Sequence, residues 1–336
     1  MKPFDLATPL SHLKNAGAQV AVACSGGLDS IALLHAACAA GLNPIALHIN
    51  HGIAAESGAW AAHVAAQAAH YGAAFACIEA TGLYSGMPSL EAAARSARHA
   101  ALGELCAKHG VGTLLLAHHA NDQAETVLLN LLRGTGLAGV GMPRERLVSN
   151  AFSSNILSNI PFNLSSVLWL RPWLDAPRSA IETYAAQHSL HWVEDPSNTD
   201  TTLRRNAVRH QLWPVVESVE PRALSSLTRF ASIALDASQL ALALAQTVLA
   251  AHTAPDGGLD WRSASKAQPE SVQQALLRAF LATHRLRPPG AAQGAAMLAQ
   301  LNALTGNGLR CSHGGGDLFF RDKRLYVRAQ LLDTRG

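Results

Sequence analysis

Short apolar runs alternate with longer helical stretches through residues 20–188 of the chain. Short apolar runs bounded by turn residues are typical of buried strands, whereas longer stretches with one apolar face predict helices. The expected strands are Val20–Cys24, Asn43–Ile49, Ala74–Ile78, Val111–Ala117 and Val167–Leu174. The expected helices are residues 28–40, Ser57–Tyr71, Ser89–Lys108 and Arg178–His188. This alternation predicts an α/β domain with a parallel, twisted sheet.

The pattern changes after Pro214 and Pro221, where the chain becomes mainly helical. Helices are expected over residues 221–251, 268–284 and 290–305, followed by a small hairpin in the tail. We therefore expect one domain over residues 1–218 and a smaller, mostly helical domain over residues 219–336. The segment Ser149–Ser166 is rich in Asn and Ser, and it is expected to be a mobile loop between two strands.

Charge is distributed unevenly along a chain of 336 residues, of which 49% are hydrophobic. Residues 1–200 contain 10 Lys and Arg against 14 Asp and Glu, a balance of −4, whereas residues 201–336 contain 16 against 9, a balance of +7. The C-terminal part is therefore a candidate partner for a polyanion such as RNA. A solvated basic face without a partner explains the charge equally well.

The five cysteines, at 24, 38, 77, 106 and 311, form no CxxC pair, so neither a zinc ribbon nor a disulfide framework is indicated. Free thiols are typical of a reducing cytoplasm. The N-terminus lacks the apolar core of a signal peptide, and Ala-rich helices such as Ser238–Ala251 are expected to be too short to span a bilayer. We therefore expect a cytoplasmic protein with no membrane partner.

The most informative stretch is Ser25-Gly26-Gly27-Leu28-Asp29-Ser30, which joins the first strand to the first helix of the α/β domain. Two glycines allow the backbone to approach an anion, and the N–H groups at the start of a helix favour negative charge. The loop is therefore a candidate phosphate cradle, with Asp29 and Ser30 expected on its exposed surface. An ordinary turn with capping side chains is the alternative. The motif SGGxDS after a strand resembles the pyrophosphate loop of the N-type ATP pyrophosphatases.

A second polar segment, AHHANDQAET, follows the fourth expected strand. Asp122 and Glu125 are three residues apart, so at the start of a helix they share a face and can bind Mg²⁺ or an ammonium group. Simple helix capping is the alternative. His118 lies at the end of the strand, where ligands gather in open α/β sheets.

Five segments in order, SGGLDS, HINHG, LEAAARSAR, AHHANDQAET and LLRGTGLAGVGMP, resemble the tRNA(Ile)-lysidine synthase family, as do the later EDPSN and RNAVRH segments. The resemblance implies a fold like that of the adenine nucleotide α-hydrolases (PP-loop). It also implies that ATP adenylates the wobble cytidine of tRNA(Ile) with a CAU anticodon, and that L-lysine displaces AMP to leave lysidine. A homodimer is compatible with this family.

The resemblance also assigns roles to single residues. It places ATP at the residues 25–30 loop and Mg²⁺ at Asp29 and Asp122, and it leaves Asp122 and His118 as alternative bases for the lysine amine. Contacts to lysine or tRNA are expected from Arg95, Glu125, Arg133, Glu194, Arg205 and Asn206. The family usually has two consecutive Asp residues where this chain has Asn121 and Asp122.

Two other functions use similar sequence features. A tRNA 2-thiolation enzyme would share the loop and the tRNA partner, but such chemistry usually needs paired cysteines. A non-catalytic tRNA-binding protein would retain the fold without the reaction, and the intact SGGLDS motif disfavours it.

Overall fold

The computed structural model describes residues 4–15, 19–50, 57–79, 90–149, 166–284, 286, 288–303, 310–313 and 316–329. The chain divides into two compact units. Unit 1 comprises Met1–Glu125 and Met142–Thr228, and unit 2 comprises Thr126–Gly141 and Arg229–Gly336. The expected domain boundary at residue 218 stays a prediction. His51, Ser89 and nearly all of the expected Ser149–Ser166 loop lie outside the described residues.

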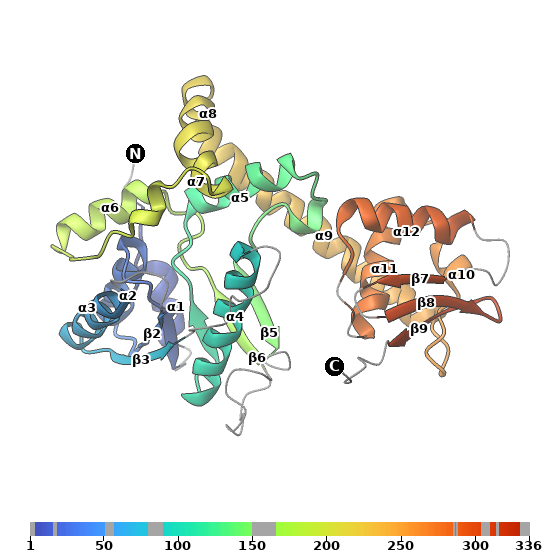
Figure 1. Ribbon diagram of the computed structural model, residues 1–336, viewed down its shortest axis with the longest axis horizontal. Helices are drawn as coiled ribbons and strands as arrows, with labels where there is room; N and C mark the ends of the chain where they lie inside the picture. Colours follow the sequence, from blue (N-terminus) through green and yellow to red (C-terminus); the bar gives the residue numbers. More distant parts are fainter. Residues whose placement is uncertain are drawn as a thin grey trace. The chain divides into compact units, whose positions relative to one another are not determined.

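Unit 1 is built on a six-stranded sheet with the order β3-β2-β1-β4-β6-β5 (Figure 1). All neighbouring strands are parallel except β5 and β6, which are antiparallel. The strands are β1 (Val20–Ala23), β2 (Ile45–Asn50), β3 (Ala74–Glu79), β4 (Thr113–Leu115), β5 (Glu145–Ser149) and β6 (Ser166–Leu170). The predicted parallel sheet is thus confirmed. The sequence pattern missed β5, which begins with three exposed residues and lacks a continuous apolar run.

Helices cover both faces of this sheet, and the alternation of side chains along the strands explains why both faces are apolar. Val20 and Val22 of β1 pack in one buried cluster, whereas Ala21 packs in the other. The first cluster contains residues of α1, α2, α3 and α6, and the second contains α4. The helices of unit 1, which include the start of α5 and of α9, are α1 (Thr8–Asn15), α2 (Leu28–Ala39), α3 (Ser57–His70), α4 (Leu90–Lys108), α5 (Ala120–Leu132), α6 (Arg178–Gln187), α7 (Arg204–Ala207), α8 (Trp213–Val219) and α9 (Ala223–His252).

Unit 2 combines helices with a small antiparallel sheet. Its core contains Trp261, Phe280 and Leu318 together with other apolar residues from helices and strands. The remaining elements are α10 (Trp261–Ser265), α11 (Glu270–Thr283), α12 (Ala291–Ala303), β7 (Arg310–His313), β8 (Gly316–Arg321) and β9 (Arg324–Ala329). The expected tail hairpin is β8 and β9, and β7 adds a third strand to it.

Helix α9 has 30 residues, an 18-residue window of mean hydropathy 1.5, and only 17% of that window buried. By length and composition alone it could cross a membrane, although a single helix of this kind is weak evidence. The expectation that the helices of this region are too short to span a bilayer is therefore wrong. The helix begins at Ala223 and not at Ser238, so it is longer than expected. The expected absence of a membrane partner stays a prediction.

Candidate active site

The loop between β1 and α2 has the geometry that its glycines predict. Gly26 has a φ of +98°, and a Cβ added there would lie 2.9 Å from Cγ2 of Val193 and 3.3 Å from Cγ2 of Val64. Both the backbone conformation and the surrounding space therefore require glycine. The N–H of Val193 donates to the carbonyl of Gly26 at 3.0 Å, which joins the loop to the segment that precedes Glu194.

The start of α2 leaves backbone N–H groups for an anion. Gly27 is the N-cap residue, with an extended backbone, and no side chain of the described residues caps this helix. Ser30 Oγ donates to the Gly27 carbonyl at 2.9 Å and lies 3.3 Å from Ser25 Oγ. Ser30 is buried, so the expectation that it lies exposed is wrong, and the Leu28 side chain belongs to the core. The cradle thus consists of backbone N–H groups and the Ser25 hydroxyl.

Sheet topology brings the second polar segment to this loop. Strands β1 and β4 are parallel neighbours, and the strand order continues from β1 through β2 and from β4 through β6. The carboxyl ends of these two strands form the switch point at which ligands bind in open α/β sheets. Residues 25–30 and 118–125 therefore meet there, as the sequence predicted for this edge.

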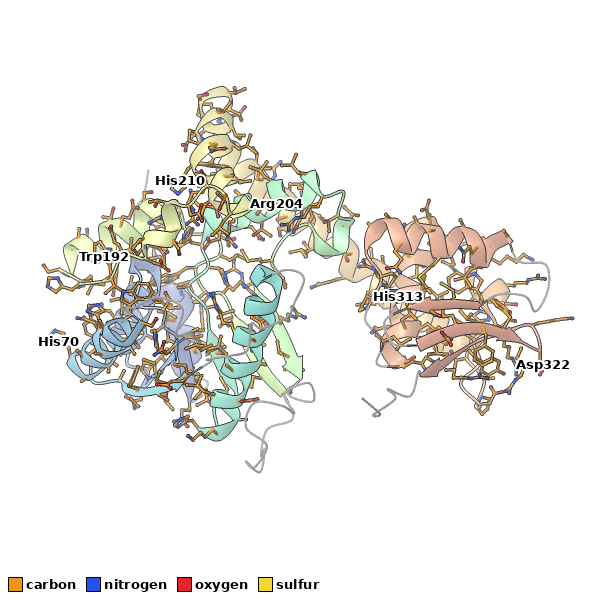
Figure 2. The ribbon with its side chains drawn as sticks, in the orientation of Figure 1. His70, Trp192, Arg204, His210, His313 and Asp322 are labelled. Atoms are coloured by element: carbon orange, nitrogen blue, oxygen red, sulfur yellow. The ribbon has the colours of Figure 1, made fainter. Side chains whose placement is uncertain are left out.

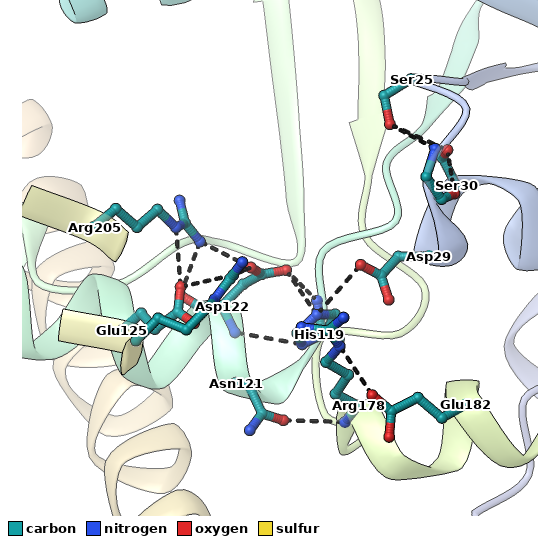
Figure 3. Close-up of polar contacts among 12 residues, drawn as sticks. Ser25, Asp29, Ser30, His119, Asn121, Asp122, Glu125, Arg178, Glu182 and Arg205 are labelled. Atoms are coloured by element: carbon teal, nitrogen blue, oxygen red, sulfur yellow. Dashed lines mark hydrogen bonds and ion pairs between the residues drawn. The ribbon is translucent and has the colours of Figure 1, made fainter. Parts of the chain in front are cut away.

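A buried histidine connects the two segments (Figure 3). Nε2 of His119 lies 3.7 Å from Oδ2 of Asp29 and 3.4 Å from Oδ2 of Asp122. His119 is also the residue before α5, where its backbone N–H donates to Asp122 Oδ2 at 3.1 Å and its Nδ1 accepts from the N–H of Asp122 at 3.4 Å. This reciprocal pair has the pattern of a capping box, so helix capping and the link to Asp29 use the same side chain.

Two carboxylates and two guanidinium groups form a network beside this histidine. Asp122 Oδ1 accepts from Arg205 Nη2 at 2.9 Å and from Arg209 Nη2 at 3.3 Å. Glu125 Oε2 accepts from Arg205 Nε at 3.0 Å, and its Oε1 accepts from Arg209 Nε at 2.7 Å. The Glu125 side chain is 4% exposed, whereas both arginines are about one quarter exposed. The buried acids are thus charge-balanced by cations that keep contact with solvent.

Neighbouring charges outweigh burial at three groups of this network. Burial opposes ionisation of Asp122, but the neighbouring His119 and Arg205 outweigh it, and the pKa of Asp122 is lowered. Burial also opposes a charge on His119, but its contacts with Asp29 and Asp122 raise its pKa. Burial likewise disfavours the Arg209 cation, yet Glu125 and Asp122 raise its pKa. Opposite charges within a few ångströms cause each of these net shifts.

His118 points to a different partner. Its Nδ1 accepts a hydrogen bond from Nε of Arg171 at 3.2 Å. Arg171 follows β6 directly and is 5% exposed. The fourth strand therefore ends in two adjacent histidines, of which His118 contacts a buried arginine and His119 contacts the two carboxylates.

Other residues that the sequence singled out have structural partners. Asn121 Oδ1 accepts from the N–H of Arg178, the first residue of α6, at 3.0 Å. Asn206 Nδ2 donates to the carbonyls of Ser197 and Asp200, both at 2.9 Å. Asn206 therefore holds the segment of residues 197–200 in place. Asn121 therefore fills a helix-capping role that needs an acceptor and no charge.

The remaining predicted residues lie outside the network. Glu194 is exposed and next to Val193, Arg133 is exposed in unit 2, and only the backbone of Arg95, in α4, is described. His210, labelled in Figure 2, lies on the segment that contains Arg209, and its Nε2 is 2.9 Å from the carbonyl oxygen of Asn198. None of the roles assigned to Glu194, Arg133 and Arg95 is tested by this arrangement, so they stay predictions.

Sequence reasoning missed His119, Arg209 and Arg171. The spacing of His119 three residues before Asp122 is the signal of a capping box, and Arg209 lies four residues after Arg205, on the same helical face. No local pattern indicated Arg171, because its partner His118 is 53 residues away in the chain.

The residues present are compatible with a bound magnesium ion. Oδ1 of Asp29 is buried and has no hydrogen-bond partner among the described residues, and Asp122 lies on the other side of His119. Mg²⁺ is usually bound by one or two carboxylates together with substrate phosphates. Within the described part of the chain, no group of three or more His, Cys, Asp or Glu side chains could hold a metal ion without such help.

Two protein-family models match the chain, the PP-loop domain over residues 5–216 and the TilS substrate binding domain over residues 262–326. The tRNA(Ile)-lysidine synthase of Ralstonia nicotianae is 43% identical over 302 residues, which are 87% of this chain and 60% of the relative. That of Bordetella pertussis is 37% identical over 328 residues, which are 92% of this chain and 96% of the relative. The chain belongs to the tRNA(Ile)-lysidine synthase family.

The chain spans 60% of the length of the lysidine synthases of Ralstonia nicotianae and Burkholderia mallei, so the comparison covers part of those proteins. Among solved structures, the U34-tRNA thiolase of Methanococcus maripaludis has a TM-score of 0.53 and 18% identity, covering 69% of this chain and 78% of the thiolase. This likeness shows the shared fold alone, and it agrees with the predicted PP-loop architecture.

Proposed function

We propose that the protein makes lysidine on tRNA(Ile) with a CAU anticodon, using ATP and L-lysine. The observation that carries this proposal is the network of Asp122, Glu125, Arg205 and Arg209 beside the loop that follows β1. The loop that follows β1 suits a phosphate chain. The network of carboxylates and arginines beside it suits an amino acid with an extra ammonium group. Family membership supplies the identity of the two substrates.

In the first step, the oxygen on C2 of the wobble cytidine attacks the α-phosphorus of ATP, and pyrophosphate leaves with the bonding electron pair. The N–H groups at the start of α2 and the Ser25 hydroxyl stabilise the negative charge on the phosphates. Gly26 and Gly27 let the backbone reach them. Asp29, at the first turn of α2, is then placed beside the phosphates, where its unpaired Oδ1 can bind a cation.

Magnesium, when bound, neutralises phosphate charge and orients the leaving group. Asp29 is the residue we expect to hold it, with Asp122 as the second candidate. His119 lies between these two carboxylates, and the positive partial charge of its ring reduces their repulsion.

In the second step, the ε-amine of lysine attacks C2, the bond from C2 to the adenylate oxygen breaks, and AMP leaves with the electron pair. Lysine first binds as an ammonium ion. Asp122 and Glu125 are the carboxylates that would take the ammonium group, and Arg205 and Arg209, which pair with them in the free protein, would take the carboxylate of lysine. The ammonium must lose a proton before it attacks. Asp122 is our candidate for the acceptor of that proton.

Affinity for tRNA is assigned to the basic C-terminal part. Residues 201–336 carry 16 Lys and Arg against 9 Asp and Glu, and the matched substrate binding domain lies within them. Phosphate contacts from such a surface release counterions, so binding should fall as salt rises. Location in the cytoplasm and assembly as a homodimer stay predictions.

The deciding experiment incubates the full chain with unmodified tRNA, ATP and labelled lysine, followed by nucleoside analysis. Labelled lysidine together with release of pyrophosphate and AMP supports the proposal. Pyrophosphate release without incorporation of lysine would redirect it toward another nucleophile, such as sulfur in a 2-thiolation. Absence of pyrophosphate release with every tRNA tested would favour a non-catalytic tRNA-binding protein.

A further inference from the structure

His118 and Arg171 meet at the carboxyl ends of two neighbouring strands. Arg171 directly follows β6, and His118 lies three residues beyond Leu115, the last residue of β4. Nε of Arg171 is 3.2 Å from Nδ1 of His118. The two side chains are 53 residues apart in the chain, so the parallel pairing of β4 and β6 creates the contact.

Arg171 is held firmly in this position. Its Nη1 donates to the carbonyl of Pro143 at 2.8 Å, and its backbone N–H donates to the carbonyl of Arg144 at 2.9 Å. With 5% of its surface exposed, it has little freedom to rotate away from His118. The guanidinium plane, and with it the direction of the Nε–H bond, is therefore fixed by the residues that precede β5.

The chemistry of the two groups then determines where the proton of His118 lies. A guanidinium group carries only donors and does not deprotonate in proteins. Nδ1 of His118 must therefore be the acceptor and carry a lone pair. In a neutral imidazole with an unprotonated Nδ1, the proton is on Nε2.

We propose that Arg171 is a positioning residue that fixes His118 as the Nε2–H tautomer, so that His118 donates a hydrogen bond during the reaction and does not accept the proton of lysine. The inference rests on the proposed function for its chemical meaning. The sequence leaves His118 and Asp122 as alternative bases, and this geometry assigns the base to Asp122. A neutral imidazole as a fixed donor can stabilise charge that develops on a substrate oxygen, such as the phosphoryl oxygen of the adenylate.

The tautomer can be measured directly. Two-bond ¹⁵N–¹H correlation spectra of the full chain, labelled at histidine, distinguish Nε2–H, Nδ1–H and imidazolium forms. The signal of His118, among 16 histidines, is assigned by its loss in His118→Gln. We expect the Nε2–H form at neutral pH. An Nδ1–H or imidazolium signal for His118 would overturn the proposal without any measurement of activity.

Variants of the two arginines separate the specific contact from a general effect of charge. Arg171→Met removes the donor, and we expect His118 to lose its exclusive Nε2–H form. Arg144→Met is the matched control, because Arg144 contacts the carbonyls of Arg171 and Pro172 but is not bonded to His118. Retention of the pure Nε2–H form in Arg171→Met, or an equal change in both variants, would overturn the assignment to Arg171.

The donor role has its own kinetic test in lysidine formation. A glutamine at residue 118 can still donate from its amide but cannot act as a base, whereas alanine can do neither. We expect His118→Gln to retain activity within about tenfold and His118→Ala to lose about 10²-fold, the usual effect of removing one oxyanion donor. Equal losses would overturn the donor role. A wild-type protein that makes no lysidine would refute the proposed function while leaving the tautomer assignment testable.

Discussion

Nε2 of His119 lies between carboxylate oxygens of Asp29 and Asp122, at 3.7 and 3.4 Å. Asp29 belongs to the loop that we assign to ATP, and Asp122 belongs to the network that we assign to lysine. One buried imidazole therefore touches both halves of the candidate site. This arrangement explains how the nucleotide and amino-acid parts of the site can keep a fixed relative position before either substrate binds.

Asp29→Asn tests the assignment of the loop. The change keeps the shape of the side chain and removes the charge that we expect to bind the cation, so pyrophosphate release should fall by at least about 10²-fold. The side chain is 32% exposed, so the fold should persist, as circular dichroism can verify. Near-wild-type pyrophosphate release from the folded variant would exclude Asp29 from the adenylation step.

Asp122→Asn tests the lysine step. We expect normal ATP binding but a loss of lysidine of about 10²-fold, partly restored by higher lysine concentration or higher pH, because the carboxylate binds or deprotonates the ammonium group. Asn121→Asp is the matched control. Since Asn121 caps α6 through its oxygen, an Asp there should leave the lysidine yield nearly unchanged. An unchanged yield for Asp122→Asn at low lysine would remove Asp122 from the mechanism.

Gly26→Ala and Gly27→Ala form a pair that tests the loop conformation. Gly26 has a positive φ and a neighbour 2.9 Å from the added Cβ, so its alanine variant should lose about 1–3 kcal/mol of unfolding free energy. Gly27 has a φ of −75°, and the nearest atom is 3.6 Å away, so its variant should lose far less. Urea unfolding of both variants measures the difference. Equal stabilities would contradict the described geometry.

The pH dependence of stability tests the contacts of His119. Its pKa is raised in the folded state, so its contribution is fully present below the unfolded value, near pH 6.5, and is lost as the pH rises through the folded value. His119→Asn keeps an acceptor for the N-cap and removes the link to the carboxylates. The stability difference between wild type and this variant should be largest near pH 6 and shrink toward pH 9. A difference that is constant across this range would show that His119 acts only as a cap.

The order of β1 to β4 and β6, and of the helices between them, could be predicted from the sequence, because these strands carry their own apolar runs and these helices their own apolar faces. β5 could not, since Glu145, Arg146 and Leu147 are exposed and only its pairing with β6 makes it a strand. The phosphate loop was also predictable, because SGGLDS is a contiguous motif and the positive φ of Gly26 is a property of the local backbone.

The tertiary structure decided which charged residues contact one another. From spacing alone, Asp122 and Glu125 share a helical face, whereas Arg205 was expected only from the family resemblance, as a contact to lysine or tRNA. Their network forms because a segment 80 to 84 residues after Glu125 returns to the start of α5. The sequence likewise gives no reason to distinguish His118 from His119. Only the folded chain shows that His118 contacts Arg171. Periodicity and local motifs are encoded by neighbouring residues, but the partner of a charged side chain depends on which distant strands pair, and only the folded chain determines that.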